Sequence, residues 1–193
     1  MVSPVIVSIG IAAAVMASLP GFDFTPRESV RELEGARFAE LLFTDGAWDV
    51  GYTPPRAWSY HGEANVLTLQ PLDKEQVDAK MVISKASGAP VKLDAAGMKA
   101  LRAQAQAILP RGGEGVRLVS EAKDAVTING HETYEATFAY GLFGQSFETC
   151  VLFVFMGDRQ MTIQVSSLPK DFAEVYGDFH GSLFSFHWMK PKS

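Results

Sequence analysis

The sequence has a single cysteine, Cys150, and this scarcity excludes several kinds of stabilisation. One thiol cannot form an internal disulfide, and it cannot build a zinc site from several cysteines. At 193 residues the chain can bury about 70% of its unfolded surface, so it needs neither a disulfide nor a metal to fold. Because Cys150 lies in an apolar segment, we interpret it as a small hydrophobic core residue and not as a nucleophile.

The chain also lacks an excess of positive charge. It carries 17 Lys and Arg against 22 Asp and Glu, a net charge of -5, and it has no run of basic residues. Nucleic acids and anionic lipids are bound mainly through basic patches. The composition therefore argues against both, and it leaves a protein or a small ligand as the unknown partner.

Recognisable catalytic and cofactor motifs are missing as well. The chain has four histidines: His61, His131, His180 and His187. No set of three ligands that includes them has the spacing of a metal site. Residues 144–148, GQSFE, begin like the nucleophile elbow of hydrolases, but they lack its second glycine and precede an expected strand. No glycine-rich phosphate loop occurs. We predict no catalytic residue, no metal and no cofactor.

The N-terminal segment carries no charged side chain, because the first charged residue of the sequence is Asp23. Residues 1–22 resemble a secretory signal, with a small-residue cleavage motif at 15–17 but no basic residue at the start. We expect export to the periplasm or the extracellular space. The alternatives are an uncleaved segment that anchors the chain in the membrane, since about 20 apolar residues can span a bilayer, and a buried N-terminal helix.

Residues 23–35 are densely charged and have few apolar anchors. Thr25 fits a helix N-cap, Pro26 the first helical position, and Glu28 a capping box. We therefore predict an exposed helical arm over residues 23–35. Residues 36–190 contain no linker or internal repeat, and we predict a single domain there.

Alternation of apolar and polar residues predicts an antiparallel sheet. The most regular stretch is residues 125–166, where three successive strands joined by short turns form a meander. Asp45-Gly46 predicts a hairpin between earlier strands. Three glutamates of the meander region are interpreted as ordinary outward-facing strand residues: Glu132, Glu135 and Glu148. The side chains expected to face inward are almost free of titratable groups: Tyr134, Phe138, Phe147, Val151, Phe153, Met161 and Ile163.

Two amphipathic helices are expected over residues 94–109 and 169–184. Asp94 is a suitable N-cap for the first, and Pro169 begins the second. Each apolar stripe would pack on the sheet. The predicted class is α+β, an antiparallel sheet with helices on both faces in an α/β/α sandwich.

Aromatic residues in expected loops provide the candidate contact sites. Residues 56–62 read as an irregular loop that carries Trp58, Tyr60 and His61, and Phe143 stands in a turn of the meander. Exposed aromatic residues on loops often mark a partner or ligand surface. The simpler interpretation of Trp58 is that it plugs the end of the sheet.

The order of these elements resembles the PsbP-like fold family, which includes small exported bacterial proteins of unassigned function. The resemblance rests on residues 48–58 (WDVGYTPPRAW), 128–130 with 134–135, 151–155 and 184–186, and it covers about residues 38–188. It implies an antiparallel sheet sandwiched by helices and a non-enzymatic accessory or binding role. The resemblance gives no catalytic residues that could be assigned to this chain. The absence of an Arg/Ser-rich transit peptide argues against a photosystem role.

Three functions remain open at this point. The first is a non-catalytic exported accessory or binding protein. The second is a small-molecule enzyme, of cyclase or isomerase type, with a His or Asp base in a pocket between sheet and helix. The third is a structural domain tethered to the membrane. A cavity that encloses a histidine or two carboxylates would favour the enzyme, because catalysis needs titratable groups in an apolar pocket.

Overall fold

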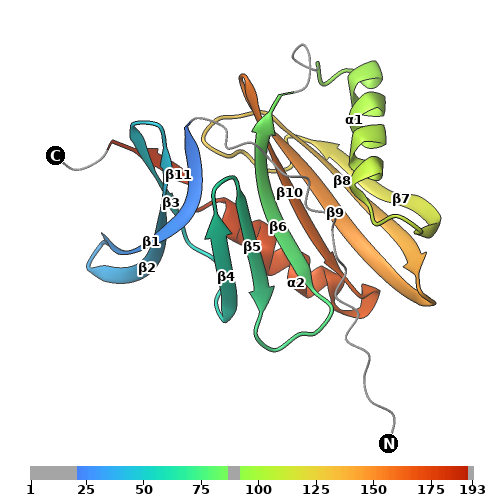
Figure 1. Cartoon of the computed structure of the whole chain (residues 1–193), viewed down its shortest axis with the longest axis horizontal. Helices are drawn as coiled ribbons and strands as arrows, with labels where there is room; N and C mark the ends of the chain where they lie inside the picture. Colours follow the sequence, from blue (N-terminus) through green and yellow to red (C-terminus); the bar gives the residue numbers. More distant parts are fainter. Residues whose placement is uncertain (1–20, 87–91, 191–193) are drawn as a thin grey trace, which may run out of the picture.

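A computed structural model describes residues 21–86 and 92–190, which form two antiparallel sheets and two helices (Figure 1). The small sheet has the strand order β1-β2-β3-β11, and the large sheet has the order β4-β5-β6-β10-β9-β8-β7. The α+β class and the antiparallel pairing are thus confirmed. The division of the strands into two sheets was not expected.

The bounds of the elements follow the chain. The strands are β1 (Phe22–Leu33), β2 (Ala36–Asp45), β3 (Trp48–Tyr52), β4 (Trp58–Glu63), β5 (Val66–Pro71), β6 (Asp78–Lys85), β7 (Glu114–Lys123), β8 (Thr133–Leu142), β9 (Gln145–Met156), β10 (Arg159–Ser167) and β11 (His187–Met189). The helices are α1 (Ala95–Ile108) and α2 (Pro169–Leu183).

The predicted helical arm at residues 23–35 is wrong, because this segment forms β1 and pairs with β2. Phe22 and Phe24 point to the same side and are buried in the core. Pro26 lies in a register shift of the ladder, where its missing N–H is tolerated. Glu34 and Gly35 both have positive φ, as a tight hairpin turn requires. The folded unit therefore includes β1 and does not begin at residue 36.

The predictions of a signal peptide or an anchor fall on residues 1–20, which lie outside the described residues. Among the residues that the structure describes, no helix is long and apolar enough to cross a membrane.

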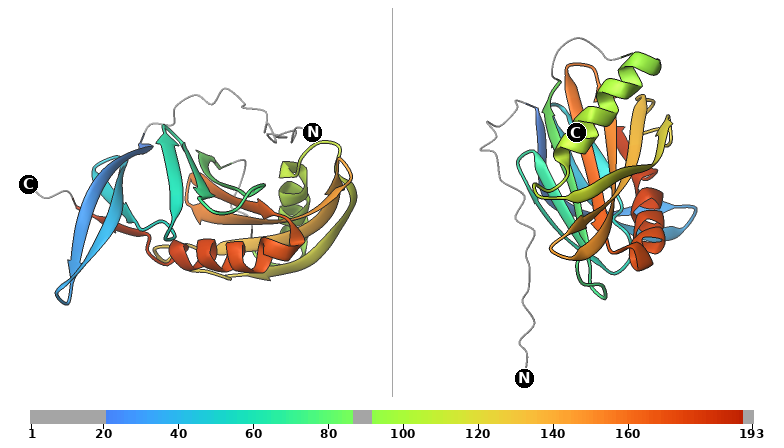
Figure 2. Two further views of the ribbon diagram at one scale, coloured as in Figure 1. Left: turned by 90° about the horizontal axis from the view of Figure 1, so that it is seen from below. Right: turned by 90° about the vertical axis from the view of Figure 1, so that its right-hand side faces the viewer.

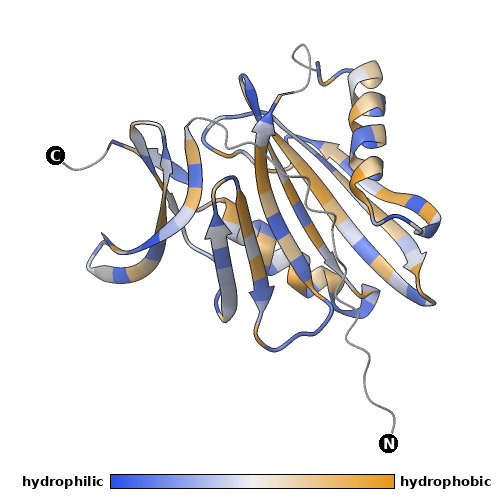
Figure 3. Cartoon of the chain, in the orientation of Figure 1, coloured by the Kyte–Doolittle hydropathy of each residue, from blue (hydrophilic) through white to orange (hydrophobic). Residues whose placement is uncertain are grey.

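The predicted meander is confirmed as β8, β9 and β10, and β9 is a central strand between the other two. Its residues face two separate clusters. Val151 and Phe153 pack with Tyr134 of β8, whereas Leu152 belongs to a cluster that includes Ile163 of β10. Figure 3 shows how apolar residues alternate with polar ones along the large sheet. Both faces of the sheet are thus buried at β9. The expectation of a single inward face is wrong, because Met161 and Ile163 lie in the cluster opposite to that of the other five residues.

The two helices join different clusters. In α1, Leu101 and Ala105 are buried with Tyr134, and the N-cap Asp94 accepts hydrogen bonds from two backbone N–H groups of the first turn. The buried residues of α2 pack with β9 and β10: Phe172, Val175, Phe179 and Leu183. Figure 2 shows α2 lying along the large sheet while the β1–β2 hairpin projects away from it.

The two sheets meet where β1 crosses β4. The Phe24 N–H donates to the Ala64 carbonyl at 2.6 Å. At this crossing Gly62 leaves no room for a side chain, because a Cβ on it would lie 2.0 Å from the Phe24 carbonyl oxygen. The crossing therefore depends on glycine for steric reasons.

A buried ion pair makes a second connection between the sheets. Arg159 at the start of β10 donates two hydrogen bonds to Asp45, at 2.6 and 3.1 Å. Trp188 of β11 donates to the same carboxylate at 2.9 Å. Asp45 thus joins the small-sheet hairpin to the large sheet and to the C-terminal strand.

Candidate functional site

Of the candidate contact residues, Trp58 and its neighbours do not form a loop. They form β4, which pairs with β5, and the period of two over residues 58–63 fits a strand. Trp58 is only 8% exposed and stacks on Phe179 of α2 at 5.9 Å. The prediction of a loop is therefore wrong, and Trp58 fills the space under α2.

Tyr60 and His61 lie on opposite sides of β4, because they are successive strand residues. The half-buried Tyr60 donates a hydrogen bond to Glu28 of β1 at 3.0 Å, and His61 is exposed. The structure thus does not gather the candidate residues of β4 into one patch. Their role as partner contacts stays a prediction.

Phe143 has the most exposed of the large hydrophobic side chains in the described part of the chain, at 81%. It occupies the two-residue turn between β8 and β9 with a φ of 52°, and Gly144 follows with a φ of 78°. Such turns favour Asn, Asp or Gly, because bulky residues tolerate positive φ poorly. Folding therefore gains little from a phenylalanine here.

A second exposed apolar side chain belongs to the same end of the large sheet. Leu72 is 73% exposed and follows β5. Gln76 of the loop after Leu72 donates a hydrogen bond to Gln145, which follows the Phe143 turn, at 3.3 Å. In the large sheet β6 and β10 separate β5 from β9, so Leu72 and Phe143 are separate positions, and we call Phe143 with its turn the apolar tip.

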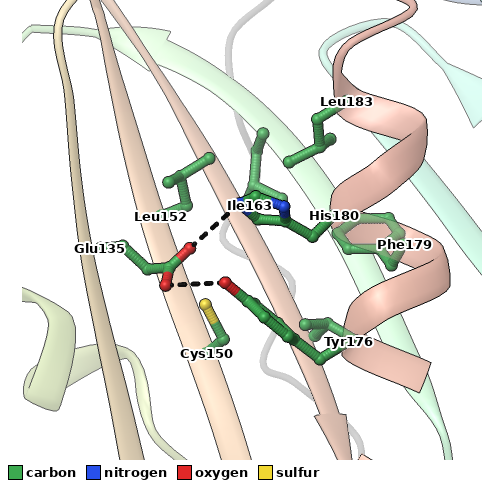
Figure 4. A pocket seen from close by; sticks show the side chains of 9 residues that line it. Glu135, Cys150, Leu152, Ile163, Tyr176, Phe179, His180 and Leu183 are labelled. Carbon is green, nitrogen blue, oxygen red and sulfur yellow. Dashed lines mark hydrogen bonds and ion pairs between the residues drawn. The ribbon is translucent and has the colours of Figure 1, made fainter. Parts of the chain in front are cut away.

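A cluster of buried and half-buried polar side chains lies between α2 and the large sheet (Figure 4). Tyr176 and His180 stand four residues apart on α2, so both project toward Glu135 of β8. Tyr176 Oη donates to Glu135 Oε1 at 2.9 Å, and His180 Nε2 lies 3.8 Å from Glu135 Oε2. These side chains link the helix to the sheet.

Glu135 is only 8% exposed, so its interpretation as an outward-facing residue is wrong. The alternation along β8 placed it correctly on the face opposite Tyr134, but that face is covered by the edge of α2. Glu132 is exposed, as expected, and Glu148 is half-buried. Phe172, Tyr176 and His180 are four residues apart, so their rings form a row along α2. This spacing was the sequence signal that could have predicted a contact between these side chains and the sheet.

The cluster lines a cavity of about 10 Å³ together with Cys150 and apolar side chains of β9, β10 and α2. That volume corresponds to about one water molecule. A histidine and a carboxylate do meet in a pocket between sheet and helix, as the enzyme alternative requires. The pocket has no room for an organic substrate.

The electrostatics of the cavity oppose nucleophilic chemistry. Burial, with a further contribution from the charge of Glu135, raises the pKa of the Cys150 thiol well above its usual value. Burial and Glu135 likewise raise the pKa of Tyr176. Both groups keep their protons at neutral pH, and the negative charge beside Cys150 disfavours the thiolate that a nucleophile requires.

A second Glu–His pair stands in the small sheet. His187 Nε2 of β11 lies 3.4 Å from Glu40 Oε1 of β2, and Gly51 of β3 lies against both. Within residues 21–86 and 92–190, no three His, Cys, Asp or Glu side chains are placed to hold a metal ion.

No protein-family model matches the sequence, and no curated protein matches it. Solved structures do. LpqN of Mycobacterium tuberculosis, which is involved in cell envelope biogenesis, matches with a TM-score of 0.55 and 12% identity over 86% of this chain and 92% of LpqN. A cyanobacterial PsbP from Synechocystis matches with a TM-score of 0.48 and 12% identity over 94% of this chain and 99% of that protein.

A protein of unknown function from Pseudomonas aeruginosa, described as a putative regulator, matches with a TM-score of 0.43 and 13% identity over 86% of this chain and 99% of its own. The chain is thus an α+β protein that shares its fold with LpqN. A PsbP protein, from the family that the sequence resembles, is also among its structural neighbours. At these identities the likeness concerns the fold alone.

Proposed function

We propose that this chain is a non-catalytic accessory protein that acts by binding a partner protein at its surface. The observation that carries the proposal is the size of the cavity between α2 and the sheet, about 10 Å³, which admits no substrate. Within it Tyr176 donates a hydrogen bond to Glu135, and His180 lies 3.8 Å from the same carboxylate. A cavity of this size supports binding at the outer surface instead.

The apolar tip is the surface that we assign to this binding. Phe143 is exposed and stands in a backbone conformation that suits Asn or Gly better, so its presence is not explained by folding. Aromatic and aliphatic anchors of this kind fill pockets on partner proteins and supply much of the binding energy.

We further propose that the protein is exported and acts at the cell envelope, with anchoring by residues 1–22 as the alternative. The apolar, uncharged start of the sequence supports export. The shared fold with LpqN, a protein involved in cell envelope biogenesis, is compatible with this location. The same proposal includes a three-layer arrangement of the large sheet between α1 and α2, which the two separate clusters support.

The test is site-specific photo-crosslinking in the native host. A photoreactive phenylalanine analogue replaces Phe143 in one variant and Val119 in another, because Val119 is also exposed, at 45%, but lies on the edge strand β7. We expect one defined crosslinked partner from position 143 and none from position 119. Equal crosslinking from both positions, or none from either, would refute binding through the tip.

A second candidate function, an enzyme, is favoured by the meeting of His180 and Glu135 between helix and sheet. The two functions are separated by complementation of a deletion strain. The binding proposal expects Phe143→Asn to fail and His180→Phe to complement, since His180 has no chemical role in it. The opposite result, with both variants folded, would establish the enzyme.

A further inference from the structure

Two buried polar atoms face the cavity between β8 and α2 without a hydrogen-bond partner. They are Glu135 Oε2 and His180 Nε2. Leaving a buried polar group unpaired costs about 1–3 kcal/mol and more for a charged one, so native proteins rarely do so. A bound molecule at this position would remove that cost.

The geometry suits a single bridging atom. The two unpaired atoms are 3.8 Å apart, which is too far for a direct hydrogen bond. One oxygen placed about 2.8 Å from each would hydrogen-bond to both. The cavity of about 10 Å³ beside them has the size of one water molecule.

The chemistry of the two atoms selects the ligand. The carboxylate oxygen accepts hydrogen bonds only, so the ligand must be a donor there, which excludes an anion. The imidazole nitrogen either accepts or donates according to its tautomer, so the ligand must be able to do both. Water meets both requirements and fits the volume.

We propose that one water molecule binds between β8 and α2 and bridges Glu135 to His180. It completes a chain of hydrogen bonds that runs from Tyr176 through Glu135 and the water to His180. The helix is then attached to β8 at two successive turns. This inference does not depend on the proposed function, because an internal water serves the fold in a binding protein and in an enzyme alike.

The test counts long-lived internal water by oxygen-17 relaxation dispersion on the full chain. His180→Phe removes the nitrogen but retains an aromatic ring, which keeps the stacking of position 180 on Tyr176 and Phe184. We expect the dispersion amplitude to fall by the contribution of one water. The matched control is His187→Phe, which removes the histidine of the other Glu–His pair and should leave the amplitude unchanged.

A second measurement needs no variant. Wild-type protein should show nuclear Overhauser effects between a long-lived water and the ring protons of His180. An unchanged amplitude in folded His180→Phe, or the absence of the water signal at His180 in the wild type, would overturn the proposal, because Glu135 and His180 would then pair directly in an empty cavity.

Discussion

Replacement of Gly62 by alanine should destabilise the protein strongly, although alanine is the better residue for most backbone positions. The methyl group would lie 2.0 Å from the Phe24 carbonyl oxygen, whereas ordinary contact begins at 3.4 Å. Strand β1 must therefore withdraw by roughly 1.4 Å, since a backbone atom cannot rotate away. That movement breaks the 2.6 Å hydrogen bond from Phe24 to Ala64 and loosens the fully buried Phe24 ring.

The expected loss in the free energy of unfolding follows from two contributions. Forcing extra volume into a packed site costs about 1–3 kcal/mol. The lost backbone hydrogen bond adds about 1 kcal/mol. Gly62 is not among the glycines with positive φ, so no backbone strain adds to these contributions. We expect a total loss of about 2–4 kcal/mol.

Urea unfolding followed by far-ultraviolet circular dichroism measures this change. Gly177→Ala is the matched control, because Gly177 lies within α2 and a Cβ there meets nothing within 4 Å. That variant should gain about 0.5–1 kcal/mol from helix propensity. If Gly62→Ala were as stable as the wild type, the close crossing of β1 over β4 would be incorrect.

Three further predictions follow from the buried and paired titratable groups. Burial raises the pKa of Cys150, so iodoacetamide at pH 8 should label the folded chain far more slowly than the unfolded chain, as followed by mass spectrometry; equal rates would contradict its burial. Burial also raises the pKa of Asp78, so its ionisation costs stability as pH rises through that value. Asp78→Asn should therefore be more stable than the wild type at pH 7, and its advantage should vanish below the usual value of 3.8; an advantage independent of pH would argue against this cause. The hydrogen bonds from Arg102 lower the pKa of Glu121. The ionised Glu121 therefore stabilises the fold above its usual pKa of 4.5, and this stability is lost as pH falls through the lowered pKa. In acid titrations of unfolding, Glu121→Gln should lack this loss, and an unchanged profile would mean that the pair does not persist in solution.

The regular elements could be predicted from the sequence because their signals are local. The meander follows from alternation over residues 134–166, and Asp94 marks the start of α1 with its side-chain oxygen. Strand β1 could not be predicted in this way. Pro26 and Glu28 satisfy the local rules for a helix start, and only pairing with β2 and burial of Phe24 select the strand.

For the candidate sites, too, the sequence predicts local features but not contacts between distant elements. The exposure of Phe143 could be predicted, because a two-residue turn leaves its side chain no core to enter. The cluster around Glu135 could not. Alternation assigns Glu135 to one face of β8, but the path of α2 over that face decides whether the carboxylate meets solvent or His180.

The contact between Trp188 and Asp45 joins residues 143 positions apart. The small sheet consequently lacks its fourth strand until residues 187–189 have left the ribosome. During synthesis β3 presents an unpaired edge, and the carboxylate of Asp45 lacks its indole partner. The small sheet is thus completed only after β11 has been synthesised. Truncation before β11 should leave a protein that resembles the unfinished translation product and is exposed to proteases and aggregation.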